Sequence, residues 1–152
     1  MLYLLFELGK DRYALEARQV VEVLPLLEFK RIPRAIPGLA GLCNYHGNAI
    51  PLIDLTELSL GRPSQAKMST RIIVTNYVND SGERHPIGVL AERVTETIRR
   101  AESDFKASGV AAENARFLGP VLVENSHIIQ RVDVHHLLPE GLQNQLFAEL
   151  VG

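Results

Sequence analysis

The sequence predicts a mainly β fold made of two related small β units, each curled into a barrel, followed by a short C-terminal helix. Short apolar strands separated by tight turns occupy most of the chain, a pattern typical of all-β proteins. Two sequence patterns of the first half also return, in the same order, in the second half. Barrels are expected because a small open antiparallel unit exposes unpaired edges, which closure protects.

The two repeated patterns have similar offsets. Ala-x-x-Val-x-Glu-x-Leu at 17–24 returns as Ala-x-x-Val-x-Glu-x-Ile at 91–98, 74 residues further on. Ile-x-x-Ile-Asp-Leu-x-x-Leu at 50–58 returns as Ile-x-x-Val-Asp-Val-x-x-Leu at 129–137, 79 residues further on. Two copies of one unit, with a slightly longer loop in the second, explain both offsets. Chance similarity between short apolar strings is the alternative.

Each copy of the second pattern carries an aspartate at the same place, Asp54 and Asp133. Both aspartates follow a predicted strand and stand where the N-cap of a helical turn belongs. Their carboxylates would accept hydrogen bonds from backbone N–H groups of that turn. A capping role therefore explains both carboxylates without catalysis.

The first half is expected to contain five strands. An apolar run starts the chain, a Gly-Lys-Asp turn at 9–11 ends it, and one helical turn at 16–19 comes before the third strand. Prolines 25, 33 and 37 predict an irregular segment, because proline removes a ladder donor and restricts the residue before it. A hairpin with a tight polar turn at 44–47 completes this half. The expected strands are 2–8, 13–15, 20–24, 39–45 and 48–53.

The second half repeats this organisation. Asn-Asp-Ser-Gly at 79–82 is a strong turn signal between two strands, and Glu-Asn-Ser at 124–126 joins two more. Residues 100–114 are polar and irregular. Leu142, Leu146, Phe147 and Leu150 have helical spacing, which predicts an amphipathic helix over 139–152. The expected strands are 70–78, 86–94, 117–123 and 127–132.

The composition restricts the classes of partner. The 152 residues are enough for a compact domain with its own core, and the net charge of -2 provides no basic excess to follow a phosphate backbone. No nucleic-acid partner is expected. The single cysteine excludes an internal disulfide and fits a reducing, cytoplasmic setting. No apolar stretch approaches the ~20 residues that cross a bilayer, so any membrane association is expected through a partner.

No arrangement typical of a metal or cofactor site is apparent. The histidines form no i, i+4 pair of the zinc-protease type, and the chain contains no CxxC pair. Gly38, Gly41 and Gly47 match no phosphate-binding pattern, and turns or close backbone approach explain them better. We therefore expect no metal, no cofactor and no catalytic residue. The five histidines are His46, His85, His127, His135 and His136.

One alternative involves thiol chemistry or ligand binding at the hairpin turn. Cys43 and His46 are close in sequence and would meet across the turn, as a nucleophilic pair requires. Such a pair also needs an orienting group and an oxyanion site, and Asp54, the nearest carboxylate, is already interpreted as a cap. A small buried thiol among the apolar positions of its strand is the favoured interpretation.

Motifs along nearly the whole chain, from about residue 3 to 138, resemble the CheW-like family, the adaptors of bacterial chemosensory arrays. Each motif is short, but together they occur in the family's order and at sensible spacing. They are Phe-x-Leu-Gly at 6–9 with Tyr-Ala-Leu at 13–15, Val-x-Glu-Val at 20–23, Gly-Leu-x-Asn-x-x-Gly at 41–47, Ile-Pro-Leu-Ile-Asp-Leu at 50–55, Thr-Arg-Ile-Ile-Val at 70–74 and Ile-Gly-Val-Leu-Ala-Glu-x-Val at 87–94.

The resemblance implies two SH3-like five-stranded β-barrels packed around a shared core. Residues 1–138 would form a single CheW-like domain, with a first barrel over about 10–68, a second over about 69–138 and exchange of terminal strands. It implies a non-catalytic adaptor that couples the cytoplasmic tip of a chemoreceptor to a CheA-like histidine kinase, whose regulatory domain shares the fold. The adaptor would be cytoplasmic and would meet the membrane only through receptor arrays.

The same resemblance assigns contact residues. Val20 and Glu22 correspond to the family's kinase-facing strand. Val89 corresponds to the receptor-facing side. The hairpin that shapes the contact surface corresponds to Gly41, Asn44, Tyr45, His46 and Gly47.

Two departures from the family pattern concern partner identity. Tyr45-His46 replaces the usual Leu-Arg of the turn, and histidine reaches less far than arginine and titrates near physiological pH. Glu92 replaces the usual aspartate of its strand. These changes suggest a chemosensory system other than the main flagellar one, and the surface-sensing Wsp pathway is compatible with the sequence. Gln130-Arg131 also interrupts an expected apolar strand.

Overall fold

A computed structural model describes residues 1–79, 81–109 and 116–138. Within them strands dominate and α1 (Leu55–Leu60) is short, which confirms the mainly β fold. The remaining helical turns are of the 3-10 type: η1 (Ala17–Gln19), η2 (Glu102–Asp104) and η4 (Val134–His136). The strands are β1 (Leu2–Leu8), β2 (Asp11–Glu16), β3 (Val20–Pro25), β4 (Lys30–Arg31), β5 (Leu39–Tyr45), β6 (Asn48–Asp54), β7 (Arg71–Val78), β8 (Arg84–Arg99), β9 (Leu118–Glu124) and β10 (His127–Val132).

All nine predicted strands are present, with two differences from the sequence-based expectation. The short β4 lies inside the segment that the prolines predict to be irregular, and it pairs with β5. β8 is 16 residues long and continues well past the predicted end at residue 94. The expected helix at 139–152 lies outside the described residues.

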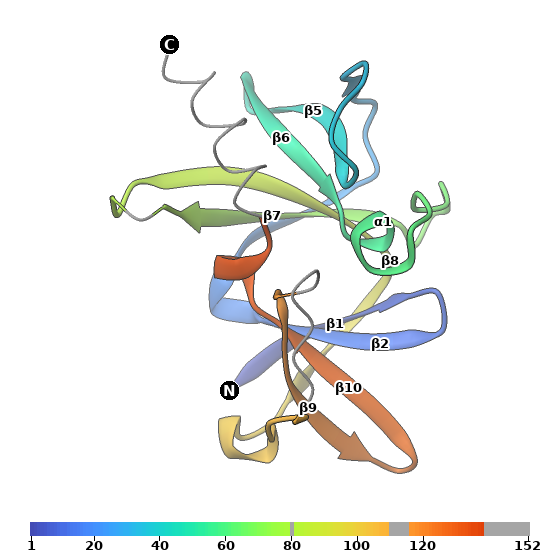
Figure 1. The fold of residues 1–152 in the computed structure, drawn as a ribbon, viewed down its shortest axis with the longest axis vertical. Helices are drawn as coiled ribbons and strands as arrows, with labels where there is room; N and C mark the ends of the chain where they lie inside the picture. Colours follow the sequence, from blue (N-terminus) through green and yellow to red (C-terminus); the bar gives the residue numbers. More distant parts are fainter. Residues whose placement is uncertain (80, 110–115, 139–152) are drawn as a thin grey trace.

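The strands form two groups that β8 connects. Residues 84–91 of β8 pair with β7, which pairs with β3, and the parallel neighbour β6 continues to β5 and β4. Residues 96–99 of β8 pair with β1, which is followed by β2, β10 and β9. Figure 1 shows β5 and β6 above β7 and β8, with β1, β2, β9 and β10 below. β8 bends between the groups at Arg93, whose φ is 46°.

The predicted internal repeat is seen in the way the strands pair, because equivalent residues of the two copies form equivalent parallel pairs. In one group Leu52 of β6 lies opposite Gly88 of β8, and the strands are parallel. In the other group Arg131 of β10 lies opposite Ala14 of β2, again in parallel. The 79-residue offset relates Leu52 to Arg131, and the 74-residue offset relates Ala14 to Gly88. The two sequence offsets therefore describe one structural unit that occurs twice.

The two units exchange strands. β3 follows β2 along the chain but pairs with β7, whereas the last part of β8 pairs with β1. β3, β5 and β6, which come before residue 68 in the chain, lie in the same group as β7 and the first part of β8. The expected bounds of the two barrels stay a prediction. Closure of each group into a barrel stays a prediction.

A shared core joins the two groups. Its largest cluster contains Phe6 and Tyr13 from one group together with Ile53 and Ile73 from the other. Smaller clusters lie under each group separately, around Tyr3 in one and around Cys43 in the other. Burial of apolar surface in this common cluster holds the two groups together. Each large apolar side chain that is removed from water stabilises the fold by roughly 1.5–3 kcal/mol.

Candidate functional site

The hairpin between β5 and β6 turns through His46 and Gly47. Both residues have positive φ, 49° and 87°, and Tyr45 lies opposite Asn48 across the loop. A two-residue loop with two positive φ angles is the type I′ turn, whose twist matches that of the flanking strands. Asn44 Oδ1 accepts a hydrogen bond from the Gly47 N–H at 2.9 Å. The predicted tight polar turn is confirmed.

A bulge in β3 brings a valine to the surface. Val20 pairs with Thr75 and Glu22 pairs with the next residue, Val74, so Val21 is the extra residue between them. A bulge of this kind disrupts the ladder locally and re-aims side chains. The side chain of Val21 lies at the surface, where the residue is 51% exposed.

Glu22 lies against the hairpin turn. Its Oε2 accepts a hydrogen bond from the Tyr45 hydroxyl at 2.9 Å and lies 3.4 Å from His46 Nε2. The rings of Tyr45 and His46 are 4.4 Å apart at their centres and tilted by 58°. The hydrogen bond to Glu22 raises the pKa of Tyr45, so its hydroxyl stays a donor. We call Glu22, Tyr45 and His46 the Glu22 cluster.

The Glu22 cluster unites residues from two separate segments to which the family resemblance assigns partner contacts. Glu22 belongs to the predicted kinase-facing strand, whereas Tyr45 and His46 belong to the predicted contact hairpin. The hydrogen bonds place all three on one surface, next to Asn44 and Gly47 of the same turn. The signal in the sequence is only that a tyrosine and a histidine stand together in the turn. Their link to β3, more than 20 residues away, has no local signature.

Three other predicted contact residues support the fold instead of presenting a side chain. Val20 is half-buried and packs against the shared core. Val89 is 3% exposed, so its side chain is unavailable to a partner, and its receptor-facing role stays a prediction about its strand. A Cβ on Gly41 would lie 2.1 Å from the carbonyl oxygen of Lys30, so glycine is required where β4 approaches β5.

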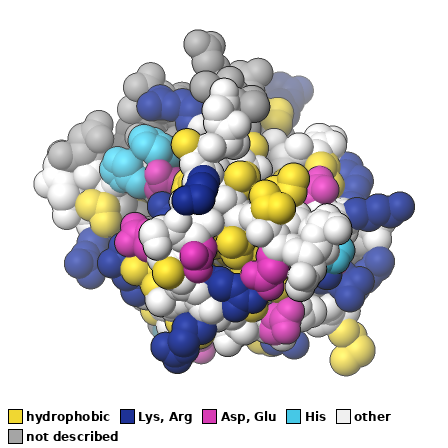
Figure 2. All heavy atoms as spheres, turned by 90° about the horizontal axis from the view of Figure 1, so that it is seen from below, with side chains coloured by type: hydrophobic (Ala, Val, Ile, Leu, Met, Phe, Trp, Pro, Cys, Tyr) yellow, Lys and Arg dark blue, Asp and Glu magenta, His cyan; other side chains and the backbone are white. Residues whose placement is uncertain are grey.

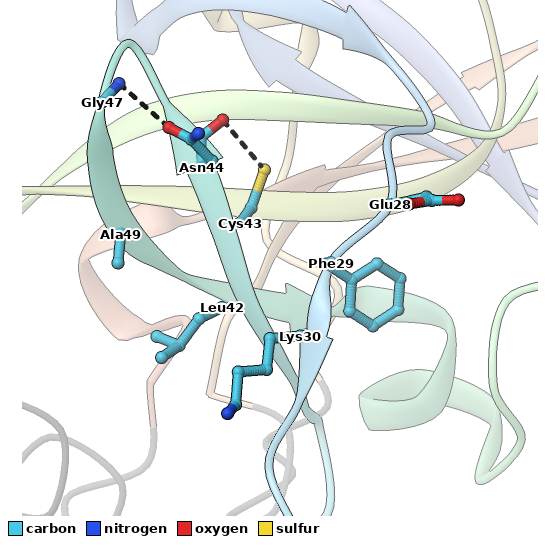
Figure 3. A pocket seen from close by; sticks show the side chains of 8 residues that line it. All are labelled: Glu28, Phe29, Lys30, Leu42, Cys43, Asn44, Gly47 and Ala49. Atoms are coloured by element: carbon cyan, nitrogen blue, oxygen red, sulfur yellow. Dashed lines mark hydrogen bonds between the residues drawn. The ribbon is translucent and has the colours of Figure 1, made fainter.

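Cys43 lies in the core beside a surface pocket of ≈ 490 Å³. The thiol is 1% exposed, burial raises its pKa, and Sγ lies 3.8 Å from the Asn44 carbonyl oxygen. Figure 3 shows Cys43 beside Asn44 among the residues that line the pocket, and the His46 ring lies 3.4 Å from Glu22 Oε2. A nucleophilic thiolate needs a lowered pKa, so this environment argues against thiol chemistry. The pocket is lined by Glu28, Phe29, Lys30, Leu42, Cys43, Asn44, Gly47 and Ala49.

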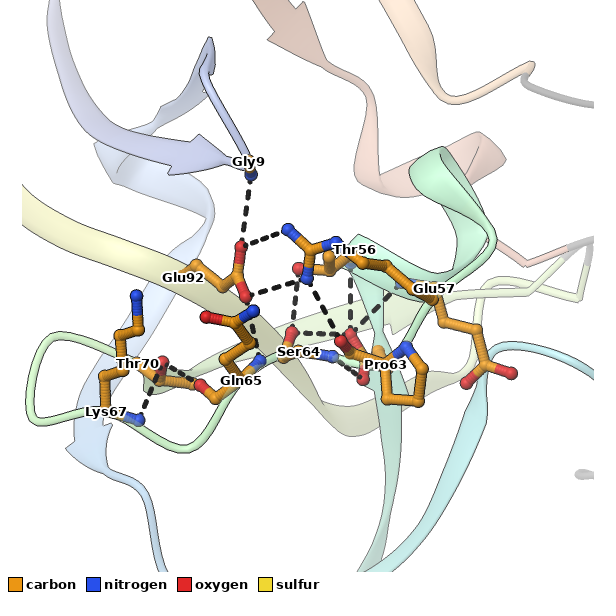
Figure 4. Close-up of polar contacts among 11 residues, drawn as sticks. Gly9, Thr56, Glu57, Pro63, Ser64, Gln65, Lys67, Thr70 and Glu92 are labelled. Atoms are coloured by element: carbon orange, nitrogen blue, oxygen red, sulfur yellow. Dashed lines mark hydrogen bonds and ion pairs between the residues drawn. The ribbon is translucent and has the colours of Figure 1, made fainter.

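Glu92 is a structural residue at the junction of the two groups. Its carboxylate accepts two hydrogen bonds from Arg62, at 3.1 and 3.2 Å, and one each from the Gln65 and Gly9 N–H groups (Figure 4). Partial burial raises the pKa of Glu92, but these bonds outweigh that effect and lower the pKa to about 2. Glu92 therefore fixes the loop at 61–70 and the turn after β1 to β8.

Asp54 fixes the other end of the same loop. Its Oδ1 accepts from the N–H groups of Thr56 and Glu57, which confirms the predicted N-cap of α1. Ser64 adds its N–H at 2.8 Å and its hydroxyl at 2.7 Å. Asp133 likewise accepts from His135 N–H at 3.0 Å, as the repeat predicts. These carboxylates hold backbone, so they are not candidate catalytic groups.

The polar pair that interrupts β10 is satisfied inside the fold. Gln130 donates to the Gly119 carbonyl at 3.1 Å. Arg131 lies 3.9 Å from Glu16 and stacks over the Phe105 ring at 5.8 Å. These two residues therefore bridge β10 to its neighbours, although the sequence pattern favours apolar side chains there.

The described residues offer little that is typical of other functional classes. No helix among them is long and apolar enough to span a membrane, and no cluster of three metal-ligating side chains occurs in the part of the chain that the structure describes. Seen from below, the surface mixes hydrophobic, basic and acidic side chains without an extended area of one charge (Figure 2).

The family model for the CheW-like domain matches residues 2–141. This chain belongs to the CheW-like domain family. Among curated proteins, this CheW-like chain is 29% identical over 101 residues to the chemotaxis protein CheW of Helicobacter pylori, covering 66% of the chain and 58% of that protein. It is 21% identical over 137 residues to the chemotaxis protein CheW of Treponema pallidum, covering 87% and 78%. The matched region thus spans little more than half of the Helicobacter relative.

A solved structure shares the fold of this CheW-like chain. The crystal structure of the scaffolding protein TtCheW from Thermoanaerobacter tengcongensis superimposes with a TM-score of 0.78 over 91% of this chain and 87% of that one. The two sequences are 22% identical. At that identity the likeness concerns the arrangement of strands, which agrees with the family assignment.

Proposed function

We propose that this CheW-like chain is a non-catalytic adaptor that couples a chemoreceptor to a CheA-like histidine kinase in a bacterial chemosensory array. The observation that carries the proposal is the match of the CheW-like family over residues 2–141, together with relatives named as chemotaxis and scaffolding proteins. In this proposal the chain works in the cytoplasm and meets the membrane only through its receptor.

The surface around β3 supports a role in binding the kinase. β3 pairs on one side with β7, and the bulge exposes Val21 beside the half-exposed carboxylate of Glu22. An apolar side chain next to an oriented charge is the composition expected of a protein contact surface. Val20, which the resemblance assigns to this contact, would act by holding the strand against the core.

The proposal is tested by measuring binding of the full chain to the regulatory domain of a CheA-like kinase from the same organism. We expect Val21→Asp to weaken binding at least tenfold, because it puts a charge into a buried contact. Val20→Asp is a poorer test, since it would also disturb the shared core. Val123→Asp is the matched control, because Val123 is 69% exposed on β9 of the other group.

Each result has a definite meaning. A large loss with Val21→Asp and unchanged binding with Val123→Asp supports kinase contact through β3. The reverse pattern would move the kinase contact to the β9–β10 group. If neither the kinase domain nor a receptor-tip hairpin binds the unmodified chain, the adaptor proposal is wrong.

A further inference from the structure

Another pocket lies between the segment 26–36, which links β3 to β5, and the loop at 61–70. Its volume is ≈ 380 Å³, which is within the range of small-molecule sites. On one side β4 is paired to β5. On the other side Ser64 is bound to Asp54, and the Thr70 hydroxyl donates to a carbonyl of its own loop (Figure 4). Contacts within the chain therefore hold both walls of the pocket in place.

The lining of this pocket combines an apolar interior with a surplus of positive charge. Asp54 accepts four hydrogen bonds from its own chain, so its carboxylate is already satisfied. Arg31, Arg34 and Glu57 also line the pocket, and their charged groups form no hydrogen bond or ion pair with another described residue. Two free cations therefore face one free anion. The apolar residues of the lining include Leu26, Phe29, Ile36, Leu39 and Leu90.

The guanidinium of Arg31 is oriented by an aromatic ring. Its Cζ lies 5.2 Å from the centre of the Phe29 ring, and both residues line the pocket. Stacking on a ring holds the plane of a guanidinium without using its N–H donors. These donors form a fork that matches the two oxygens of a carboxylate. Arg31 is thus suited to bind an anion at the edge of the pocket.

Arg34 has a backbone conformation that is costly for arginine. It follows Pro33 in a turn, and its φ is 57°, in the region that favours glycine or asparagine after a proline. The next turn, at Pro37, has the favoured residue, since Gly38 follows with a φ of 97°. The guanidinium of Arg34 has no partner among the described residues that would offset this cost. Strain of this kind is typical of residues that serve a binding site.

We propose that this pocket binds a small monocarboxylate with an apolar body. Arg31 and Arg34 bind the carboxylate, and the apolar lining holds the body. The charge surplus excludes a cation of the same shape, and the apolar interior disfavours a small polar anion. This inference does not depend on the adaptor proposal, because the residues assigned to kinase or receptor contact do not carry it.

The test titrates the isotope-labelled full chain with three probes of one shape at pH 7, followed by NMR. The probes are phenylacetate, which is an anion, 2-phenylethanol, which is neutral, and phenethylamine, which is a cation. A ligand of this size is expected to bind with a Kd of about 1 mM. Phenylacetate should shift the methyl signals of Leu26, Leu39 and Leu90, and the other two probes should bind at least fivefold more weakly.

Arg34→Gly is the decisive variant, because glycine adopts the positive φ and removes the guanidinium. It should weaken the binding of phenylacetate at least fivefold while the Tm stays the same or rises. Arg93→Gly is the matched control, since Arg93 is also an arginine with positive φ, 46°, but lies outside the pocket. It should bind phenylacetate as the unmodified chain does. Arg31→Gln, in the exposed part of the lining, should weaken binding without depending on the turn.

The proposal is wrong if the three probes bind equally, or if phenylacetate causes no shift up to about 20 mM. Shifts confined to Leu42 and Ala49 would place the probe in the pocket beside Cys43 and would equally contradict it. Unchanged affinity in both Arg34→Gly and Arg31→Gln would remove the carboxylate site. A lower Tm of Arg34→Gly with unchanged affinity would assign Arg34 to the fold. Each of these outcomes leaves the adaptor proposal standing.

Discussion

Glu92 shows how one carboxylate is used where three segments meet. It stands on β8 beside the bend at Arg93, and its donors come from the turn after β1 and from the loop after α1. The side chain is 10% exposed, so a neutral or shorter replacement would leave donors without a partner. An aspartate at this position would be one methylene shorter. Glu92 therefore contributes to the stability of the fold through hydrogen bonds made within the chain.

We predict that Glu92→Gln destabilises the fold by about 2 kcal/mol, the range for hydrogen bonds to a charged group. The pKa of Glu92 is about 2 in the fold, below its ordinary value of 4.5. Its contribution is therefore complete above about pH 5 and is lost as the pH falls toward 2. Urea unfolding at pH 7, 5 and 3 should show the difference between the variant and the unmodified chain shrinking with acidification.

Glu28→Gln is the control for this series, because Glu28 is an exposed glutamate outside the network. It should change stability little at any of the three pH values. A difference for Glu92→Gln that stays constant from pH 7 to pH 3 would contradict the role of the charged carboxylate.

At the scale of elements, the repeat places two capping aspartates in different surroundings. Asp54 is 3% exposed and holds both α1 and the loop through Ser64. Asp133 caps the 3-10 turn η4 through one backbone hydrogen bond and lies nearer the surface. We therefore expect Asp54 to contribute more to the free energy of unfolding than Asp133, although both occupy the same position of the repeat.

We predict that Asp54→Ala costs about 2–3 kcal/mol, because a buried cap and a loop anchor are lost together. Asp133→Ala should cost about 0.5–1 kcal/mol, as for an ordinary cap. Thermal or urea unfolding of both variants gives the comparison directly. Equal losses would mean that the Ser64 contacts contribute nothing beyond capping.

Local sequence signals account for much at this scale. Alternating apolar residues and turn residues locate the strands, the tight polar turn at 44–47 and both caps, whereas the I′ geometry of that turn comes from the structure. They could not locate β4, because its pairing depends on the approach that Gly41 permits to the Lys30 carbonyl. They also miss the Glu22 cluster and the donors of Glu92, which join residues 23 to 83 positions apart. Such contacts arise from tertiary packing.

At the scale of the whole molecule, strand exchange makes the two groups interdependent. β3 follows β2 in the chain but pairs with β7 in the other group. The last part of β8, which follows β7, pairs with β1 in the first group. The apolar clusters follow the same logic, since the largest one draws on both groups. Repeat patterns in the sequence predict two similar units, but they cannot show which copy of a strand completes which group.

We predict that neither 1–68 nor 69–152 folds alone, since each fragment lacks strands that its partner supplies. Mixing the two in equal amounts should restore the dispersed NMR spectrum of the intact chain. A fragment that gives a dispersed spectrum and unfolds cooperatively by itself would contradict the exchange.

The central claim, that this chain bridges receptor and kinase, is tested most directly by co-sedimentation with receptor-tip hairpins assembled on vesicles. The kinase regulatory domain should sediment with these vesicles when the full chain is added, stay in solution without it, and sediment less with Val21→Asp than with Val123→Asp. Sedimentation of the kinase domain that is the same with and without the chain would contradict the account.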